Sequence, residues 1–194
     1  MTVCMTETQL PWVALVGAAG SGKDTVAQEM VEQYGYTRVA FADPVRAALL
    51  ALDPLLPQEG LGTLRLCTAV GELGWEDAKR LYPEVRYLLQ RLGTDAIRSQ
   101  VPYYWCDLAE RTAVAADGPV VFTDTRFINE LRMVESYGGT VVEVQRHNNP
   151  VLDSTAATHT SENEWRSWYP RFTVRNDGSK ADLAAAVDTL MEHI

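Results

Sequence analysis

The stretch GAAGSGKDT constrains this chain more than any other segment. It follows the apolar run WVALV and satisfies the spacing G-x-x-x-x-G-K through Gly17, Gly22 and Lys23. Glycines allow a backbone to curl around an anion, and a helix that begins near the lysine directs its positive end at the same point. Because a strand is expected before the stretch and a helix after it, we predict a phosphate-binding loop rather than a simple glycine-rich turn. The predicted phosphate-binding residues are Gly17, Ala18, Ala19, Gly20, Ser21, Gly22, Lys23, Asp24 and Thr25.

The rest of the chain alternates between short apolar runs and segments with helical periodicity. Strands that are apolar throughout indicate a parallel sheet covered on both faces. The predicted fold class is therefore α/β, a P-loop NTPase three-layer sandwich with about five parallel strands. The predicted strands are 11–17, 36–42, 118–124, 140–146 and 171–176. The predicted helices are 23–35, 43–52, most of 75–115, 127–139 and 179–193, and Ser179 and Asp182 in the last are spaced as a capping box.

We expect a single domain over residues 1–194 with two insertions. The first insertion, at about 53–115, is mostly helical, and prolines and glycines interrupt its pattern near its start. The second, at about 147–170, has no clear period and is interpreted as a lid-like segment, with Trp165 and Trp168 as anchors near its end. The sheet and its covering helices are expected at about 11–52, 116–146 and 171–194.

The composition narrows the class of partners. The formal net charge is −9 and the pI is about 4.8, which argues against a broad nucleic-acid surface but allows a small phosphate pocket. No apolar run reaches the roughly 18 residues of a membrane span, and the sequence starts without the pattern of a secretion signal. Cys4, Cys67 and Cys106 have no metal-like spacing and indicate reduced thiols. We expect a cytoplasmic protein without nucleic-acid or membrane partners, and a homodimer is left open.

Five segments carry a resemblance to a known family. GxxGSGKDT, FADPVR, LLQRLGTDAIR, FTDTRFINE and THTSENE, in this order, resemble the phage-type deoxynucleoside monophosphate kinases over about residues 12–175. The resemblance implies transfer of the ATP γ-phosphate to deoxynucleoside monophosphates, with Mg²⁺, for viral DNA synthesis. Two alternatives stay open: a kinase of another small phosphorylated metabolite such as dephospho-coenzyme A, and a non-catalytic module that binds nucleotide. The base preference of the acceptor is not predicted.

The resemblance implies roles on the ATP side. Nucleoside monophosphate kinases have a similar loop with threonine in the place of Thr25, and they hold magnesium largely through waters and nucleotide oxygens. Asp124, at the end of the third strand, would orient a magnesium-bound water, or else cap the next helix. Asp24 would cap its own helix or hold a magnesium water, and capping is favoured. Thr25 and Asp124 are therefore the metal candidates, through water. The catalytic candidates are Lys23, Asp124, Arg126 and Arg146, with Arg146 at the base of the lid.

The acceptor side is expected to hold arginines for a second phosphate, since the planar guanidinium suits bidentate phosphate contacts. Arg126 resembles the arginine with which monophosphate kinases bind the acceptor phosphate, and Asn129 and Glu130 would hold it in place or merely solvate a helix. RLGTDAIR would present one polar helical face, for which a solvated, salt-bridged surface is the alternative. Asp43 could equally be a helix cap. The acceptor candidates are Asp43, Arg46, Arg91, Thr94, Asp95, Arg98, Arg126 and Asn129.

Overall fold

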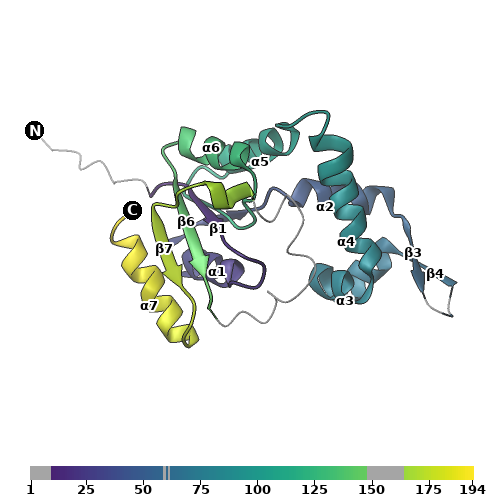
Figure 1. Cartoon of the computed structure of the whole chain (residues 1–194), viewed down its shortest axis with the longest axis horizontal. Helices are drawn as coiled ribbons and strands as arrows, with labels where there is room; N and C mark the ends of the chain where they lie inside the picture. Colours follow the sequence, from purple (N-terminus) through teal and green to yellow (C-terminus); the bar gives the residue numbers. More distant parts are fainter. Residues whose placement is uncertain (1–9, 59, 61, 148–163) are drawn as a thin grey trace, which may run out of the picture. The chain divides into compact units, whose positions relative to one another are not determined.

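The computed structural model describes residues 10–58, 60, 62–147 and 164–194 of the chain. Its main feature is a five-stranded sheet in which every neighbouring pair is parallel (Figure 1). The strands follow the order β2-β5-β1-β6-β7, so β1 lies in the centre of the sheet. This confirms the predicted α/β class with five parallel strands. The strands are β1 (Val13–Val16), β2 (Thr37–Val39), β5 (Val120–Phe122), β6 (Thr140–Gln145) and β7 (Phe172–Arg175).

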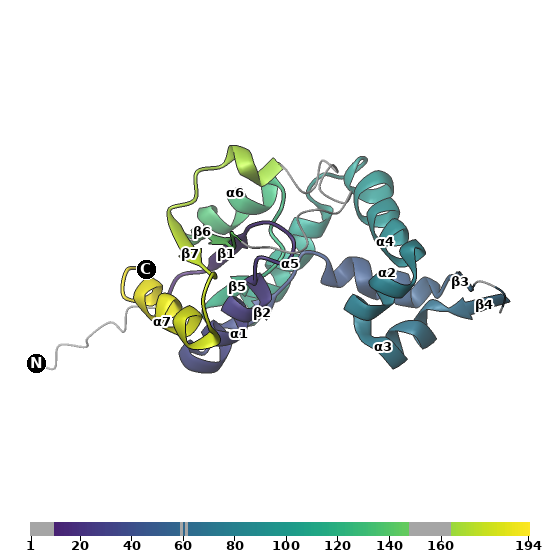
Figure 2. The same ribbon diagram turned by 60° about the horizontal axis from the view of Figure 1, so that its bottom comes forward.

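The strands are apolar because both faces of the sheet are covered. All four residues of β1 and all three of β5 are buried. The helices α1 (Lys23–Tyr34) and α7 (Lys180–Met191) pack on one face, where Met30 and Val187 join the core with Val13 and Val142. The helix α6 (Ile128–Ser136) contacts β1 and β6, and Figure 2 shows it on the other side of the sheet from α1 and α7. The result is a three-layer arrangement.

The ends of these helices follow local sequence signals. Gly35 ends α1 in the left-handed conformation, with φ 70°, and donates its N–H to the carbonyl of Met30, as its place in the sequence predicted. The predicted capping box of α7 is confirmed, because Ser179 N–H donates to Asp182 Oδ2 and Asp182 N–H donates to Ser179 Oγ. Within α1, Val26 and Met30 are buried in the core, whereas the neighbouring Val31 is 37% exposed.

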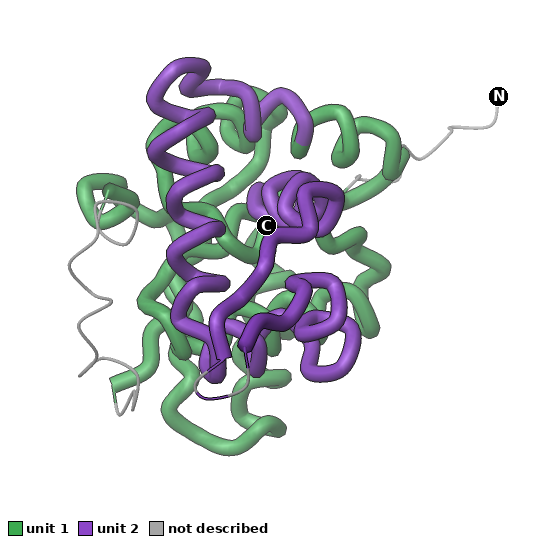
Figure 3. Tube along the Cα trace, turned by 90° about the vertical axis from the view of Figure 1, so that its right-hand side faces the viewer, with its two compact units in different colours: residues 1–40, 109–194 green, residues 41–108 purple. Residues whose placement is uncertain are grey.

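The chain divides into two compact units, residues 1–40 with 109–194, and residues 41–108 (Figure 3). The second unit has a core of its own, formed by Leu49, Leu56, Leu66, Ala69, Ala78 and Val85. It begins at Phe41 and so includes the helix that we expected to belong with the sheet. Its elements are α2 (Asp43–Leu52), β3 (Leu55–Gln58), β4 (Gly62–Arg65), α3 (Leu66–Leu81), α4 (Pro83–Gln90) and a π-helix (Arg91–Arg98).

The second unit contains secondary structure that the sequence did not predict. The strands β3 and β4 form an antiparallel hairpin where only an interruption by prolines and glycines was expected. Buried Leu56 explains the hairpin, since it is fully enclosed by the core of the unit. The helix α5 (Tyr104–Ala115) leads the chain from this unit back into the first. Among the described residues, no helix is both long enough and apolar enough to cross a membrane.

Candidate active site

The phosphate-binding loop predicted from the sequence connects the central strand β1 to α1. Gly17, Gly20 and Gly22 have φ values of 143°, 75° and 101°, conformations that residues with a side chain rarely adopt. A Cβ on Gly17 would lie 2.4 Å from the carbonyl oxygen of Val144 in β6. Glycine is therefore required at this position both by the backbone conformation and by the neighbouring strand.

Lys23 is the first residue of α1, and its side chain folds back onto the loop. Its Nζ donates to the carbonyl oxygens of Gly17 at 2.8 Å and Ala18 at 2.9 Å. The ammonium group is thus held at the loop by the loop's own backbone. A cation in this position can exchange carbonyl oxygens for the oxygens of a bound phosphate.

Asp24 and Thr25 occupy the first turn of α1, and both are exposed. The helix cap is Gly22, which makes no side-chain capping bond, so the favoured capping role of Asp24 was wrong. Asp24 lies inside the helix, where its charge still interacts favourably with the positive end of the helix dipole. The hydroxyl of Thr25 stays accessible for a ligand outside the chain.

Asp124 and Arg126 follow β5, the strand beside β1. The cap of the next helix, α6, is Phe127, which removes the alternative that Asp124 caps this helix. Glu130 is only 1% exposed, and its carboxylate accepts hydrogen bonds from the backbone N–H of Arg126 at 2.8 Å and of Phe127 at 3.1 Å. The interpretation that Glu130 holds Arg126 in place therefore agrees with the structure at the level of the backbone. Asn129 accepts a hydrogen bond from the N–H of Glu130 through Oδ1.

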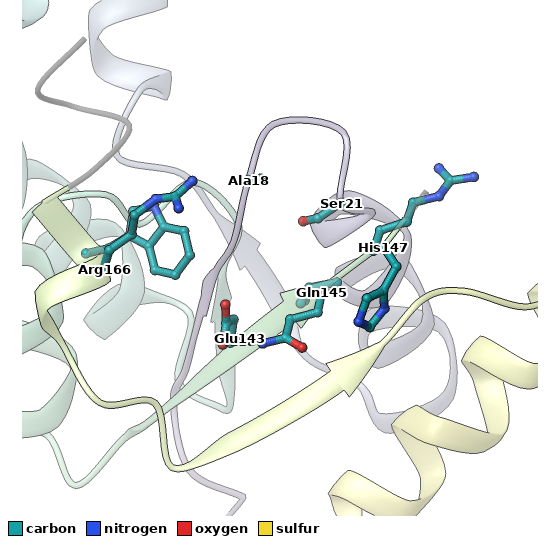
Figure 4. A pocket seen from close by; sticks show the side chains of 9 residues that line it. Ala18, Ser21, Glu143, Gln145, His147 and Arg166 are labelled. Atoms are coloured by element: carbon teal, nitrogen blue, oxygen red, sulfur yellow. Dashed lines mark hydrogen bonds between the residues drawn. The ribbon is translucent and has the colours of Figure 1, made fainter. Parts of the chain in front are cut away.

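A cavity of about 250 Å³ lies beside the phosphate-binding loop. Figure 4 shows Glu143 and Gln145 below the loop, with Arg166 and His147 on opposite sides. The cavity is lined by Ala18, Ser21, Glu143, Val144, Gln145, Arg146, His147, Trp165 and Arg166. The buried hydroxyl of Ser21 has no hydrogen-bond partner among the described residues, so a ligand in this cavity would find an unused polar group there.

Arg146 lines this cavity with Ala18 and Ser21 of the predicted loop, whereas the other six lining residues were not predicted as ligands. Trp165 and Arg166 come from a 3₁₀-helix (Glu164–Ser167), and the guanidinium of Arg166 lies 5.4 Å from the centre of the Trp165 ring. Trp165 is buried, as expected of an anchor, and the indole of Trp168 donates to Glu135. Most of the predicted lid, residues 148–163, lies outside the described residues.

The two metal candidates, Thr25 and Asp124, both carry oxygen atoms, the ligand type that Mg²⁺ prefers. Among the described residues, no group of three or more His, Cys, Asp or Glu side chains is arranged to hold a metal. Mg²⁺ commonly keeps several waters and binds through one or two protein oxygens together with substrate phosphates. The accessible hydroxyl of Thr25 and the carboxylate of Asp124 are oxygen donors of that kind.

The remaining predicted acceptor residues belong to the second unit. In α2, Arg46 Nη1 lies 3.1 Å from Asp43 Oδ1, and the guanidinium lies 5.8 Å from the centre of the Trp75 ring. Asp43 is not the cap of α2, because that position is Ala42. The carboxylate of Asp43 instead forms an ion pair with Arg46 within the second unit.

The segment RLGTDAIR is helical, but it is a π-helix where an α-helical face was expected. The N–H of Ser99 donates to the carbonyl of Thr94, five residues back. Gly93 is buried against Val45, and its carbonyl accepts a hydrogen bond from the indole of Trp105. The expected pairing within the segment is present as a long contact of 3.9 Å between Arg91 and Asp95. Arg98 and Thr94 are half-buried.

The structure thus assigns the predicted residues to two groups. The loop from Gly17 to Thr25 belongs to the first unit, together with Asp124, Arg126, Asn129 and Arg146. The second unit holds Asp43, Arg46, Arg91, Thr94, Asp95 and Arg98. The central parallel strand, the glycine loop and its lysine define a protein of the P-loop class.

Comparison with known proteins gives a more specific assignment than the P-loop class. The profile of the deoxynucleotide monophosphate kinase family matches residues 69–187, and the chain belongs to this family. A protein of Acanthamoeba polyphaga mimivirus, provisionally named a deoxynucleotide monophosphate kinase, is 28% identical over 171 residues, which cover 80% of this chain and 82% of the viral protein.

Solved structures also resemble this chain. TT1252 from Thermus thermophilus has a TM-score of 0.49 and 18% identity, and the match covers 96% of this chain and 98% of that one. Shikimate kinase from Aquifex aeolicus has a TM-score of 0.48 and 15% identity, with 93% and 95% covered. The fold assignment depends on the strand order and the loop, and these two matches add nothing to the choice of substrate.

Proposed function

We propose that this protein transfers the γ-phosphate of ATP to deoxynucleoside 5′-monophosphates and so supplies diphosphates for DNA synthesis. The observation that carries the proposal is the pair of hydrogen bonds from Lys23 to the carbonyls of Gly17 and Ala18, in a glycine loop after the central strand. Membership of the deoxynucleotide monophosphate kinase family supports the same activity. Reduced thiols, with Cys67 and Cys106 both free, support a cytoplasmic location.

On the donor side, the loop would bind the phosphates of ATP through its backbone N–H groups and through Lys23. The ammonium would leave the carbonyls of Gly17 and Ala18 and follow the β- and γ-phosphates. Thr25 and Asp124 would hold Mg²⁺ through its waters, and the ion would neutralise charge on the transferred group. Arg146 lines the cavity beside the loop and would add a further positive charge there.

On the acceptor side, Arg126 is the central residue of the proposal. Its backbone N–H is fixed by the buried carboxylate of Glu130, which limits the positions that the guanidinium can reach. The planar guanidinium can bind two oxygens of a monophosphate at once. In the second unit we assign Thr94 and Asp95 to the base or sugar of the acceptor and the arginines to its phosphate. The residues of that unit in the proposal are Asp43, Arg46, Arg91, Thr94, Asp95 and Arg98, and Asn129 is proposed to support Arg126.

This set of residues suits phosphoryl transfer because the reaction needs little covalent help from the protein. Phosphoryl transfer requires the attacking oxygen and the leaving oxygen in line, together with stabilisation of charge on the migrating group. Backbone amides, one lysine and several arginines can supply both. No general base is required in this proposal, and none is assigned.

A coupled assay of ADP release tests the proposal. The purified protein is given ATP and Mg²⁺ with dAMP, dGMP, dCMP, dTMP or dephospho-coenzyme A in turn, and ATP alone is the blank. We expect release above the blank with at least one deoxynucleoside monophosphate. Release with dephospho-coenzyme A alone would overturn the assignment of the acceptor, and binding of ATP without release on any acceptor would indicate a non-catalytic module.

A further inference from the structure

Asn176 connects the end of the sheet to the phosphate-binding loop. It follows β7 directly, and its backbone N–H donates to the carbonyl of Gln145 in β6 at 2.8 Å. Its side-chain Nδ2 donates to the carbonyl of Ser21 at 2.9 Å. The backbone of Asn176 is therefore fixed by the sheet while its amide group holds the loop, although 155 positions separate Asn176 from Ser21 in the sequence.

The contact also depends on the glycine that follows Ser21. A Cβ on Gly22 would lie 2.1 Å from Nδ2 of Asn176, which is a severe steric clash. The φ of Gly22 is 101°, which independently favours glycine. Gly22 thus leaves space for the amide of Asn176, a requirement that the motif spacing does not reveal.

The hydrogen bond to Ser21 has a consequence for the donor group on the other side of the same peptide bond. In a trans peptide the C=O and the following N–H point in opposite directions, and the described chain has no cis peptide bonds. When Asn176 fixes the Ser21 carbonyl, it also fixes the N–H of Gly22, which points away from Asn176. Backbone N–H groups of this loop are the groups that bind phosphate in a site of this type.

We propose that Asn176 is a positioning residue that orients the peptide between Ser21 and Gly22, so that the Gly22 N–H is ready to donate to a nucleotide polyphosphate. The proposal rests on the proposed function, because it assumes that the loop binds ATP. Asn176 touches no reacting atom in this account. By holding the loop in place beforehand, Asn176 lowers the free energy that is needed to order the loop when the phosphates bind.

Asp177, the next residue, offers a matched comparison. Its carboxylate accepts hydrogen bonds from the backbone N–H of His147 at 2.7 Å, and it pairs with the His147 ring at 2.7 Å. These contacts hold the segment that follows β6 and do not involve Ser21. A variant of Asp177 therefore perturbs the same turn without removing the bond to the phosphate-binding loop.

The experiment measures ATP and ADP binding by isothermal titration calorimetry, together with steady-state KM values, for the full-length protein and three variants. Asn176→Ala removes the donor, and Asn176→Asp keeps the shape but places an acceptor opposite the Ser21 carbonyl. We expect Asn176→Ala to raise the Kd and KM of ATP by about three- to tenfold, the scale of one lost hydrogen bond. Asn176→Asp should raise them further, and Asp177→Asn should change them less than Asn176→Ala does, because Asp177 holds His147 and not the loop. The acceptor KM should stay within twofold in all three variants.

The outcomes separate this inference from the proposed function. If the wild-type protein binds no ATP, the proposed function itself fails. If wild type binds ATP and the folded Asn176→Ala variant binds it equally well, the positioning role is overturned. Thermal unfolding of each variant checks folding, and the isosteric Asn176→Asp variant decides the matter if Asn176→Ala does not fold. An equal rise in the ATP and acceptor KM values would also contradict the inference, since it would indicate a general loss of structure.

Discussion

At the scale of single residues, the glycines and the lysine of the loop were predictable because their requirements are local. Gly17, Gly22 and Lys23 lie within a stretch of seven residues, and their spacing between an expected strand and an expected helix predicts a phosphate-binding loop. The residues that support them were not predictable in the same way. Asn176 reaches Ser21 from the far end of the chain, and no periodicity in the sequence indicates that contact. For Glu130 the sequence left two roles open, holding Arg126 in place or solvating a helix, since a carboxylate near a helix start has several possible roles.

The first prediction concerns the lysine of the loop. Lys23→Ala should lower turnover by about two to three orders of magnitude, because it removes a group that would stabilise charge in the transition state. The melting temperature should change little, since the bonds that are lost hold the loop and belong to neither hydrophobic cluster. Steady-state turnover and thermal unfolding measure the two effects. Lys180→Ala, which changes an exposed lysine at the start of α7, is the control. Turnover within threefold of wild type in Lys23→Ala would exclude this loop as the ATP site.

The second prediction concerns Arg126. Arg126→Lys keeps the positive charge but loses the planar group that binds two phosphate oxygens. We expect a raised acceptor KM and a reduced kcat, with the ATP KM nearly unchanged, and initial-rate kinetics with each substrate varied in turn measure all three. Arg132→Lys, an exposed position on α6, serves as the matched control. A selective rise in the ATP KM would place Arg126 on the donor side instead.

At the scale of elements, the strands and most helices could be predicted because their patterns are short and repeat along the chain. The five apolar runs all became strands of the parallel sheet, and the cap of α7 was predicted from two residues. The hairpin β3–β4 and the π-helix at Arg91–Arg98 were missed. Both depend on tertiary contacts, since Leu56 is enclosed by its unit and Gly93 packs against Val45 while binding Trp105. Helix and strand propensities, which are read from the local sequence, do not predict such tertiary contacts.

The third prediction concerns the contact between α1 and α7. The hydroxyl of Tyr34 donates to Asp188 at 2.6 Å, and this bond, followed by partial burial and the nearby negative charges, raises the pKa of Tyr34 from 10.0 to about 12. The folded state therefore favours the neutral phenol. The resulting stabilisation is complete below pH 10.0 and is lost as the pH rises through about 12.

Urea unfolding of wild type and Tyr34→Phe at pH 8 and near pH 12 tests whether this stabilisation is lost as the pH rises. At pH 8 the wild type should be more stable by about 0.5–1 kcal/mol, the scale of one exposed hydrogen bond. Near pH 12 the difference should shrink, because the ionised phenol can no longer donate to the carboxylate. Tyr169→Phe is the control, since Tyr169 is 94% exposed. A difference that grows with pH would show that the assigned direction of the pKa shift is wrong.

At the scale of the whole molecule, each of the two units contains a hydrophobic cluster of its own among the described residues. Val85 in the second unit and Val187 in the first are both fully buried and have the same side chain. Truncating either to alanine should lower the free energy of unfolding by about 2 kcal/mol, from the lost methyl groups and the cavity left behind. The two variants thus form a matched pair that differs only in which unit is loosened.

The fourth prediction follows from the proposed assignment of acceptor binding to the second unit. Val85→Ala should raise the acceptor KM more than the ATP KM, and Val187→Ala should not share this bias. Initial rates at a temperature where both variants are folded give the four constants. If Val85→Ala raised the ATP KM and left the acceptor KM unchanged, the second unit would not be the acceptor unit.

The position of Lys23 bears on which anions the protein can hold. Its ammonium donates to two carbonyl oxygens of its own loop, so an incoming anion competes with these contacts for the N–H donors of the lysine. A small anion with one charge, such as chloride, offers little in exchange. A polyphosphate offers several charged oxygens at once, and its attraction to the ammonium is between two full charges, whereas a carbonyl oxygen carries only a partial charge. The contacts of Lys23 should therefore favour a polyphosphate over a small anion with one charge at this loop.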